Sequence, residues 1–365
     1  MYRMLLLLPW LYACLLFAGS ATAHNDAPEQ VYDGPYVFNQ GSIWQALWVC
    51  GGQAKQLRFK APTRPQWLSN CGMGAQLRAE PANRPPINYP LPAKLAAISD
   101  IHGQFPVFTQ LLMAHGIIDV SGNWQFGHGQ LVISGDVFDR GPTQTEALWF
   151  IYRLQQQAQT AGGKLHLLLG NHEVMVLNGD YRYLHDKYRH TADILGYPLA
   201  RLYAEDTVLG QWLRSSNVLV KIGNLLFVHG GLHPDLAKEQ HSLEEINQVF
   251  TQNLMKDKRN KRRGFARYLH KKHGPIWYRG YFKSPLASEA EIDLLRQHFG
   301  IDTLIVGHTT QPHILSRYHG KVIAIDSGIK GGETGEILLY ENQRFYRGLL
   351  DGSTVPLSSE VALSD

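Results

Sequence analysis

The stretch Gly135-Asp136-Val137-Phe138-Asp139-Arg140-Gly141 decides the fold class of this chain. It follows the continuous apolar run 131–133 and precedes a segment with helical patterning, residues 143–161. A short, continuous apolar run is typical of a strand that is buried on both faces. A strand, a polar turn and a helix in that order predict an α/β sheet whose ligands bind beyond the carboxyl ends of its strands.

The same order of apolar run and polar turn occurs at four more places along the chain. The polar residues that follow these runs are Asp100 and His102, Asn171 and His172, His229, and His308. Because the carboxyl ends of parallel strands meet at one edge of a sheet, we expect these side chains to lie close together. Carboxylate and imidazole groups without thiolates suit divalent Mn, Fe, Zn or Co. A carboxylate shared between two such ions can hold them roughly 3.5–4 Å apart and activate a water between them.

Taken in order, these five segments resemble the motifs of the phosphoprotein phosphatases, a family of calcineurin-like, dinuclear metallophosphoesterases. The resemblance covers residues 94–348. The segments Ile276-Trp277-Tyr278-Arg279-Gly280 and Gly307-His308-Thr309 are most similar to the bacterial, Shewanella-like branch of that family. Ser99 stands where the first family motif has a glycine, and this departure removes no ligand.

The resemblance implies a four-layer α/β (α+β) sandwich, in which two mixed β-sheets are flanked by helices. It also implies a role for each polar residue. Asp100 and His102 would bind the first of two divalent ions (Mn, Fe or Zn), Asp136 would bridge both ions, and Asn171, His229 and His308 would complete the second. His172 would be the general acid, oriented by Asp139. Arg140 and Arg279 would bind the phosphate, a task that suits the guanidinium group.

This site predicts a phosphatase that hydrolyses phosphomonoesters on proteins or peptides, at phosphotyrosine, phosphoserine or phosphothreonine. The expected reaction is in-line attack by a metal-bridging hydroxide, with a histidine as the acid for the leaving group. Two alternatives stay open from the sequence. One is hydrolysis of dinucleoside polyphosphates or other phosphate esters at the same site, and the other is a non-catalytic, exported metal-binding module.

Each residue also has a plainer interpretation when it is taken alone. An isolated Asp is more often a helix cap, an isolated buried His a satisfied imidazole, and Asp139 with Arg140 an ordinary ion pair. Glu173 is expected to support its loop rather than to bind metal. Arg214 is interpreted as a surface salt bridge rather than a phosphate contact, and His233 as a loop residue.

The first 23 residues have the pattern of a secretory signal peptide. An apolar run at 5–18 follows Arg3, and Ala21-Thr22-Ala23 has the small residues expected before cleavage at His24. An uncleaved membrane anchor and a lipoprotein signal that ends at Cys14 are the alternatives. We expect a periplasmic or secreted protein that has no membrane segment after cleavage.

The rest of the chain divides into three predicted parts. Residues 24–92 form a small strand-rich region with a Cys50–Cys71 disulfide and a Pro-rich linker, because an even pair of cysteines in an exported chain favours a disulfide. Residues 93–350 form the phosphoesterase domain, with helical insertions at about 181–216 and 234–298, and 351–365 form a tail. The late apolar runs 322–325, 337–340 and 345–346 are expected to form antiparallel strands.

Composition agrees with an ordered protein and excludes a strongly basic one. The 365 residues are 44% hydrophobic and 18% charged, with a formal net charge of +4. Residues 256–272 contain nine Lys or Arg and one Asp. A solvated basic helix is the expected structure there, and we expect no stable nucleic acid partner, because few aromatic residues accompany the charges.

Overall fold

The computed structural model describes residues 30–255 and 261–358. The predicted signal peptide, the start of the basic stretch and the end of the tail lie outside the described residues. Among the residues that are described, no helix has both the length and the apolar character needed to cross a bilayer.

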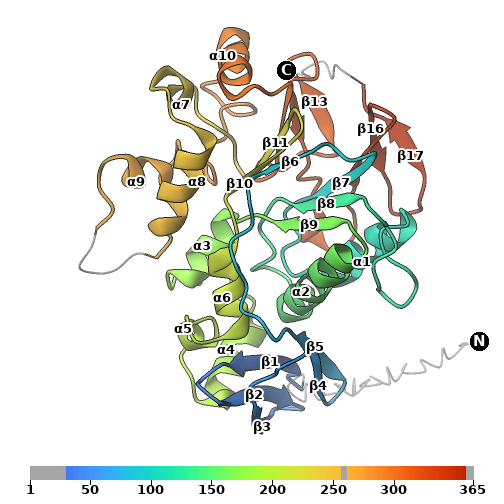
Figure 1. Cartoon of the computed structure of the whole chain (residues 1–365), viewed down its shortest axis with the longest axis vertical. Helices are drawn as coiled ribbons and strands as arrows, with labels where there is room; N and C mark the ends of the chain where they lie inside the picture. The colour runs from blue at the N-terminus through green and yellow to red at the C-terminus, as the bar shows by residue number, and fades with distance from the viewer. Residues whose placement is uncertain (1–29, 256–260, 359–365) are drawn as a thin grey trace, which may run out of the picture. The chain divides into compact units, whose positions relative to one another are not determined.

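The first large sheet carries the strands that precede the first three polar turns (Figure 1). Its order is β17-β16-β15-β7-β8-β9, and β7, β8 and β9 are parallel. The strands are β7 (Lys94–Ile98), β8 (Gln130–Ile133), β9 (Lys164–Leu167), β15 (Ile337–Glu341), β16 (Arg344–Gly348) and β17 (Thr354–Pro356). The predicted late strands β15 and β16 are antiparallel to each other, and β15 is antiparallel to β7.

The second large sheet carries the strands that lead to the two late histidines. Its order is β13-β14-β12-β11-β10-β6. The strands are β6 (Asn88–Tyr89), β10 (Leu219–Ile222), β11 (Leu225–Val228), β12 (Thr303–Val306), β13 (Leu315–Arg317) and β14 (Val322–Ala324). The expectation of antiparallel late strands is wrong for β14, which lies parallel to β12. Its antiparallel neighbour is β13.

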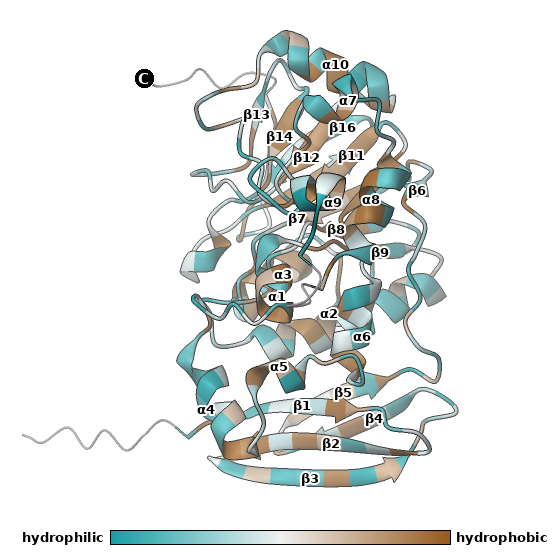
Figure 2. Cartoon of the chain, turned by 90° about the vertical axis from the view of Figure 1, so that its left-hand side faces the viewer, coloured by the Kyte–Doolittle hydropathy of each residue, from teal (hydrophilic) through white to brown (hydrophobic). Residues whose placement is uncertain are grey.

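The two large sheets share one apolar core. Leu95, Ala97 and Val132 of the first sheet pack in one cluster with Phe227 and Ile305 of the second. Because successive side chains of a strand point to opposite faces, the alternate residues pack with the helices in a separate cluster. The strands are therefore apolar on both faces, and Figure 2 shows β11, β12 and β14 coloured as hydrophobic. This arrangement confirms the predicted layers of mixed sheets and helices.

Helices occupy the outer layers and both insertions. α1 (Phe105–Ala114) and α2 (Gln144–Thr160) contact each other, and α2 also contacts β9. α3 (Asn171–Leu177) begins directly at the third polar turn. The insertions contain α4 (Asp186–Leu195), α5 (Leu199–Leu202), α6 (Val208–Ser215), α7 (Asp235–Lys238), α8 (Leu243–Gln252), α9 (Gly264–Leu269) and α10 (Glu289–Phe299).

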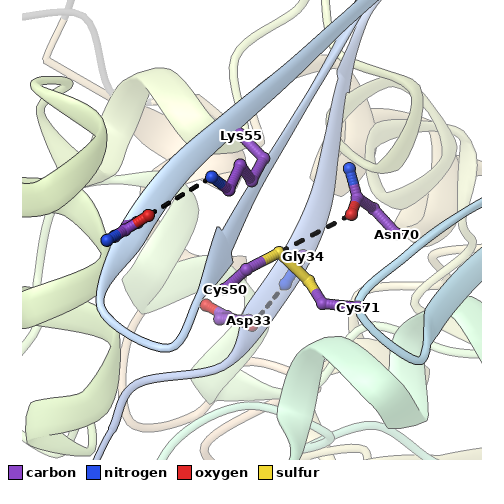
Figure 3. Close-up of a disulfide and its surroundings, with 7 residues drawn as sticks. Asp33, Gly34, Cys50, Lys55, Asn70 and Cys71 are labelled. Atoms are coloured by element: carbon purple, nitrogen blue, oxygen red, sulfur yellow. Dashed lines mark hydrogen bonds between the residues drawn. A yellow bond between two sulfur atoms is a disulfide. The ribbon is translucent and has the colours of Figure 1, made fainter.

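The N-terminal strands form two small antiparallel sheets that a disulfide connects. The sheets are β1-β2-β3, with β1 (Asp33–Phe38), β2 (Ile43–Cys50) and β3 (Gln53–Lys60), and the hairpin of β4 (Gln66–Asn70) with β5 (Met73–Leu77). Cys50 at the end of β2 is bonded to Cys71 in the hairpin turn (Figure 3). β1 and β5 contact α2, and β1 also contacts α6, so these strands belong to the same compact unit as the large sheets.

The Pro-rich stretch before β7 is hydrogen-bonded to the end of α6 and to the residues that follow it. Arg84 donates hydrogen bonds to the backbone carbonyls of Arg214 and Ser216, and the Asn217 amide donates to the carbonyl of Pro85 at 2.9 Å. β6 then pairs in parallel with β10 at the edge of the second sheet. Prolines do not prevent this, because an edge strand needs few backbone donors.

Candidate metal centre

The five polar turns meet around one carboxylate oxygen, Oδ2 of Asp136. Nε2 of His229 lies 3.2 Å from this oxygen, Nε2 of His102 lies 3.7 Å away, and Nε2 of His172 lies 3.8 Å away. Nε2 of His102 also lies 3.8 Å from Oδ1 of Asp100. All these side chains are buried. The predicted convergence of strand ends is thus present in the structure.

Two groups of potential metal ligands share Asp136. One contains His102, Asp136 and His172, and the other contains Asp136, His229 and His308, with the ligand atoms of each group within 4.8 Å of one another. The Asn171 carbonyl oxygen lies 3.0 Å from Nε2 of His229. Nε2 of His308 is buried and has no hydrogen-bond partner among the described residues. Because an unsatisfied buried nitrogen is costly, its position fits a metal ligand better than a structural histidine.

Backbone strain is concentrated at this centre. Six of its residues have positive φ angles although none is glycine: Asp100 (55°), His102 (48°), Asp136 (56°), Asp139 (71°), Arg140 (67°) and His308 (64°). This conformation is uncommon for L-residues and persists only where the surrounding fold imposes it. The strain points to a functional site rather than to ordinary turns.

The turns are held by side chains and carbonyls around the centre. The carboxylate of Glu173 accepts hydrogen bonds from the backbone N–H groups of Asp136, Val137 and Gly170, at 2.8, 2.7 and 2.7 Å. Nδ1 of His102 donates to the carbonyl of Phe138, and Nδ1 of His229 donates to the carbonyl of Ser134, both at 2.7 Å. These bonds direct the Nε2 atoms of both rings into the centre.

Glycine is required at Gly135 for two separate reasons. Its φ is +84°, and a Cβ atom there would lie 2.3 Å from the backbone nitrogen of Gly170. Only a residue without a side chain lets the second and third turns approach so closely. The glycine that begins the motif 135–141 is therefore required by the close contact between these two turns.

The electrostatics of the centre favour a bound cation. Burial lowers the pKa of His229, but the carboxylates of Asp136 and Asp100 outweigh it and raise this pKa to about 10. Burial raises the pKa of Asp136, yet the neighbouring His229 and His172 hold it well below its usual range. At His102, burial outweighs the nearby Asp136 and, together with His172, lowers the pKa of this ring to about 3.

His172 and Asp139 form a pair beside the centre. Nδ1 of His172 is 2.5 Å from Oδ2 of Asp139, and the backbone N–H of Asp139 donates to the Gln144 side chain at 3.0 Å. Burial lowers the pKa of His172, but the carboxylates of Asp136 and Asp139 raise it above its ordinary value. A histidine fixed through Nδ1 presents Nε2 to the centre and can carry a proton there.

The two predicted phosphate-binding arginines have different partners near the centre. Arg140 is exposed, and its guanidinium lies 5.2 Å from the ring centroid of Tyr183. Arg279 donates from Nη1 to the carbonyl of His308 at 2.5 Å and to the Thr309 hydroxyl at 3.3 Å. Arg214, in contrast, donates to the carbonyls of Tyr203 and Gly210 and belongs to the fold of the first insertion.

Two residues of the site are absent from the sequence prediction. Tyr183 is 45% exposed, and its ring centroid lies 5.3 Å from that of His172. Asp326 is buried and follows β14, and after burial it is the largest cause of the raised pKa of Asp100. The rule that found the other turns also fits Asp326, which follows the apolar run 322–325, whereas no sequence pattern singles out Tyr183.

Comparisons with known proteins agree with this geometry. The family model of calcineurin-like phosphoesterases matches residues 93–312. A solved structure of a cold-active protein-tyrosine phosphatase from a psychrophilic Shewanella species is 42% identical, with a TM-score of 0.85 over 90% of this chain and 99% of that one. An uncharacterised protein of Schizosaccharomyces pombe is 32% identical over 67% of this chain and 76% of its own length. Shewanella-like protein phosphatase 2 of Arabidopsis thaliana is 26% identical over 66% and 72%.

Proposed function

We propose that this chain, which belongs to the calcineurin-like phosphoesterase family, is a phosphatase that acts on phosphotyrosine in proteins or peptides. The chain is a metal-dependent phosphatase, and its family uses two divalent metal ions. The observation that carries the proposal is the pair of ligand groups that share Asp136, one of which includes His172, together with the exposed ring of Tyr183 beside His172.

We assign the metal ligands from this geometry. Asp100, His102 and Asp136 would hold one ion, and Asp136, Asn171, His229 and His308 would hold the other. When bound, the two ions supply an activated water and neutralise charge on the phosphate. The identity of the ions is open among Mn, Fe and Zn, which all accept nitrogen and oxygen ligands.

In this proposal His172 protonates the leaving group. As the bond between phosphorus and the tyrosine oxygen breaks, that oxygen takes the proton from Nε2 of His172. The Asp139 carboxylate holds Nδ1 and stabilises the charged ring before the transfer. Arg140 and Arg279 would bind phosphate oxygens from two sides, because guanidinium groups form paired hydrogen bonds with them.

The ring of Tyr183 supports the preference for phosphotyrosine. It is exposed beside the proposed acid and beside Arg140. Aromatic rings pack favourably edge to face or offset, and such a pair contributes about 1 kcal/mol beyond its buried area. The Shewanella structure that matches 90% of this chain is also that of a protein-tyrosine phosphatase.

The test compares matched phosphotyrosine and phosphoserine peptides with the full chain, first stripped of metal and then supplied with Mn. We expect activity only with metal, a faster rate on phosphotyrosine, and loss of activity in Asp136→Asn. Tyr183→Phe should keep the preference, whereas Tyr183→Ala should reduce it about fivefold. Faster hydrolysis of phosphoserine or of a dinucleoside polyphosphate would contradict the proposal.

We also propose that the protein acts outside the cytoplasm. The Cys50–Cys71 disulfide supports this, because disulfides persist in oxidising compartments. Fractionation of bacteria that express the chain should find it in the periplasm or the medium, and a cytoplasmic, reduced protein would contradict it.

A further inference from the structure

A cavity of about 820 Å³ lies next to the metal centre. Its wall is formed by the loop after β11, by residues 270–273 at the end of the basic stretch, and by residues 277–280 and 283–287. Lys271, Lys272, Lys283, Tyr278 and Glu291 line it together with Arg279.

Two residues join this cavity to the metal centre. Arg279 lines the cavity and also donates to the carbonyl of His308, one of the proposed ligands. Trp277 lines the same cavity, and its ring centroid is 5.7 Å from that of His308. A substrate whose phosphate contacts Arg279 would therefore extend its neighbouring residues into this cavity.

The cavity has an excess of positive charge. Lys271, Lys272 and Lys283 are exposed, and within the described parts of the chain none of them forms an ion pair. The acidic residue of the wall is already engaged, since Glu291 lies 3.2 Å from Nζ of Lys238 and accepts the backbone N–H of Ser288 at 3.0 Å. Three ammonium groups thus line the cavity without an ion pair among the described residues, whereas the charge of Arg279 is felt by the carboxylates of Asp100, Asp136 and Asp326.

Aromatic and imidazole rings also line the cavity. The rings of His233 and His273 are stacked with centroids 4.1 Å apart, and the ring of Tyr278 packs edge-on against His233. A wall of this kind supports an extended peptide, while the lysines attract its charged side chains.

We infer that this cavity is a subsite for an anionic group, a carboxylate or a second phosphate, on the residues that flank the phosphorylated residue of the substrate. The inference rests on the proposed function and adds a preferred sequence context to it. Four cations around one cavity favour an anion over a neutral side chain, and salt should weaken this preference because the lysines are exposed.

The experiment measures kcat/KM on one phosphotyrosine peptide in three forms, with Gln, Glu or phosphoserine at the positions on each side of the phosphotyrosine. For the unaltered chain we expect the Glu and phosphoserine forms to exceed the Gln form by about three- to tenfold at low salt. In the double variant Lys272→Gln with Lys283→Gln this ratio should fall close to one. The matched control, Lys55→Gln with Lys60→Gln on β3, should keep it.

Free phosphotyrosine serves as the reference substrate, since it has no flanking residues. All variants should hydrolyse it equally, which also shows that they are folded and hold their metals. Equal rates on the Gln and Glu peptides, or a preference that survives in the Lys272 and Lys283 variant, would overturn the inference alone. Failure of the unaltered chain on every phosphotyrosine substrate would instead overturn the proposed function, and the inference with it.

Discussion

The charge of His172 depends on its two carboxylate neighbours, and this has a measurable consequence. Burial lowers the pKa of His172, but the carboxylates of Asp136 and Asp139 raise it by more, so the pKa lies above its ordinary value. A general acid works while it is protonated, so activity is lost as the pH rises through its pKa. Asp139→Asn removes one of the two raising charges. We therefore expect the alkaline loss of kcat to move to lower pH, together with a fall in kcat of about 100-fold at neutral pH.

A pH profile of kcat for both proteins checks this prediction. Asp186→Asn, which removes an exposed carboxylate at the start of α4, is the control and should keep the original profile. An alkaline limb that stays in place in Asp139→Asn would show that Asp139 does not set the protonation of His172.

The proposed ligands could be predicted because each follows an apolar strand, and an apolar run followed by a polar residue can be recognised in the sequence alone. Asp326 follows the same pattern after β14 and should have been included on that ground. Tyr183 could not be found in this way. It lies in an insertion without a motif. Tertiary contacts place it at the centre: the backbone N–H of Arg140 donates to its carbonyl at 2.9 Å, and its ring packs near that of His172.

At the scale of elements, the start of α3 joins two of the polar turns. The Glu173 carboxylate accepts hydrogen bonds from three backbone N–H groups of the second and third turns. Its negative charge is also favourable at the N-terminal end of α3, where the helix dipole is positive. In Glu173→Gln one acceptor oxygen becomes a donor that faces these N–H groups. We expect a loss of about 2 kcal/mol in the free energy of unfolding, and metal affinity about 10- to 100-fold weaker.

Urea unfolding of the metal-stripped protein and metal titration measure the two effects separately. Glu333→Gln, a change at an exposed carboxylate, is the control. Unchanged metal affinity in Glu173→Gln would mean that the turns keep their geometry without the carboxylate.

The positions of the strands in the sequence were easier to predict than the strands that they pair with in the sheets. Continuous apolar runs identify β7, β8, β11 and β12, because these strands are buried on both faces. The direction of β14 was missed, since the same run suits a parallel or an antiparallel neighbour. β6 was missed as well, because its two residues become a strand only through pairing with β10.

At the scale of the whole molecule, the disulfide ties the N-terminal sheet to the β4–β5 hairpin. Cys50 and Cys71 are separated by 21 positions. Closing a loop of this length restricts the unfolded chain and stabilises the folded one by about 3 kcal/mol. We expect Cys50→Ala with Cys71→Ala to lose about this much stability but to keep its kcat, because neither strand region contributes a residue to the metal centre.

Urea unfolding under oxidising and reducing conditions tests this prediction. The reduced, unaltered chain should match the double variant, while the oxidised chain should be more stable. Equal stability of all three would mean that the packing of the hairpin on α2 and β1 holds it without the disulfide.

The N-terminal strands were expected to form a region of their own, ahead of a linker. In the structure, β2 and β3 contact α4, and β1 contacts α6. Sequence could not reveal this, because the apolar faces of short strands do not identify the surface that covers them. Export and the signal peptide remain predictions.

The ligands of the metal centre come from the ends of both large sheets, from residue 100 to residue 308. The backbone N–H of His308 donates to Oδ2 of Asp100 at 2.9 Å, so the two sheets already meet at the centre through the protein itself. A partly folded chain with only the first sheet formed would offer four of the six proposed ligands, and one with only the second sheet would offer two. Metal affinity therefore measures whether the sheets have docked, and each bound ion shifts the folding equilibrium towards the complete sandwich. Metal binding at the catalytic centre therefore stabilises the contact between the two sheets.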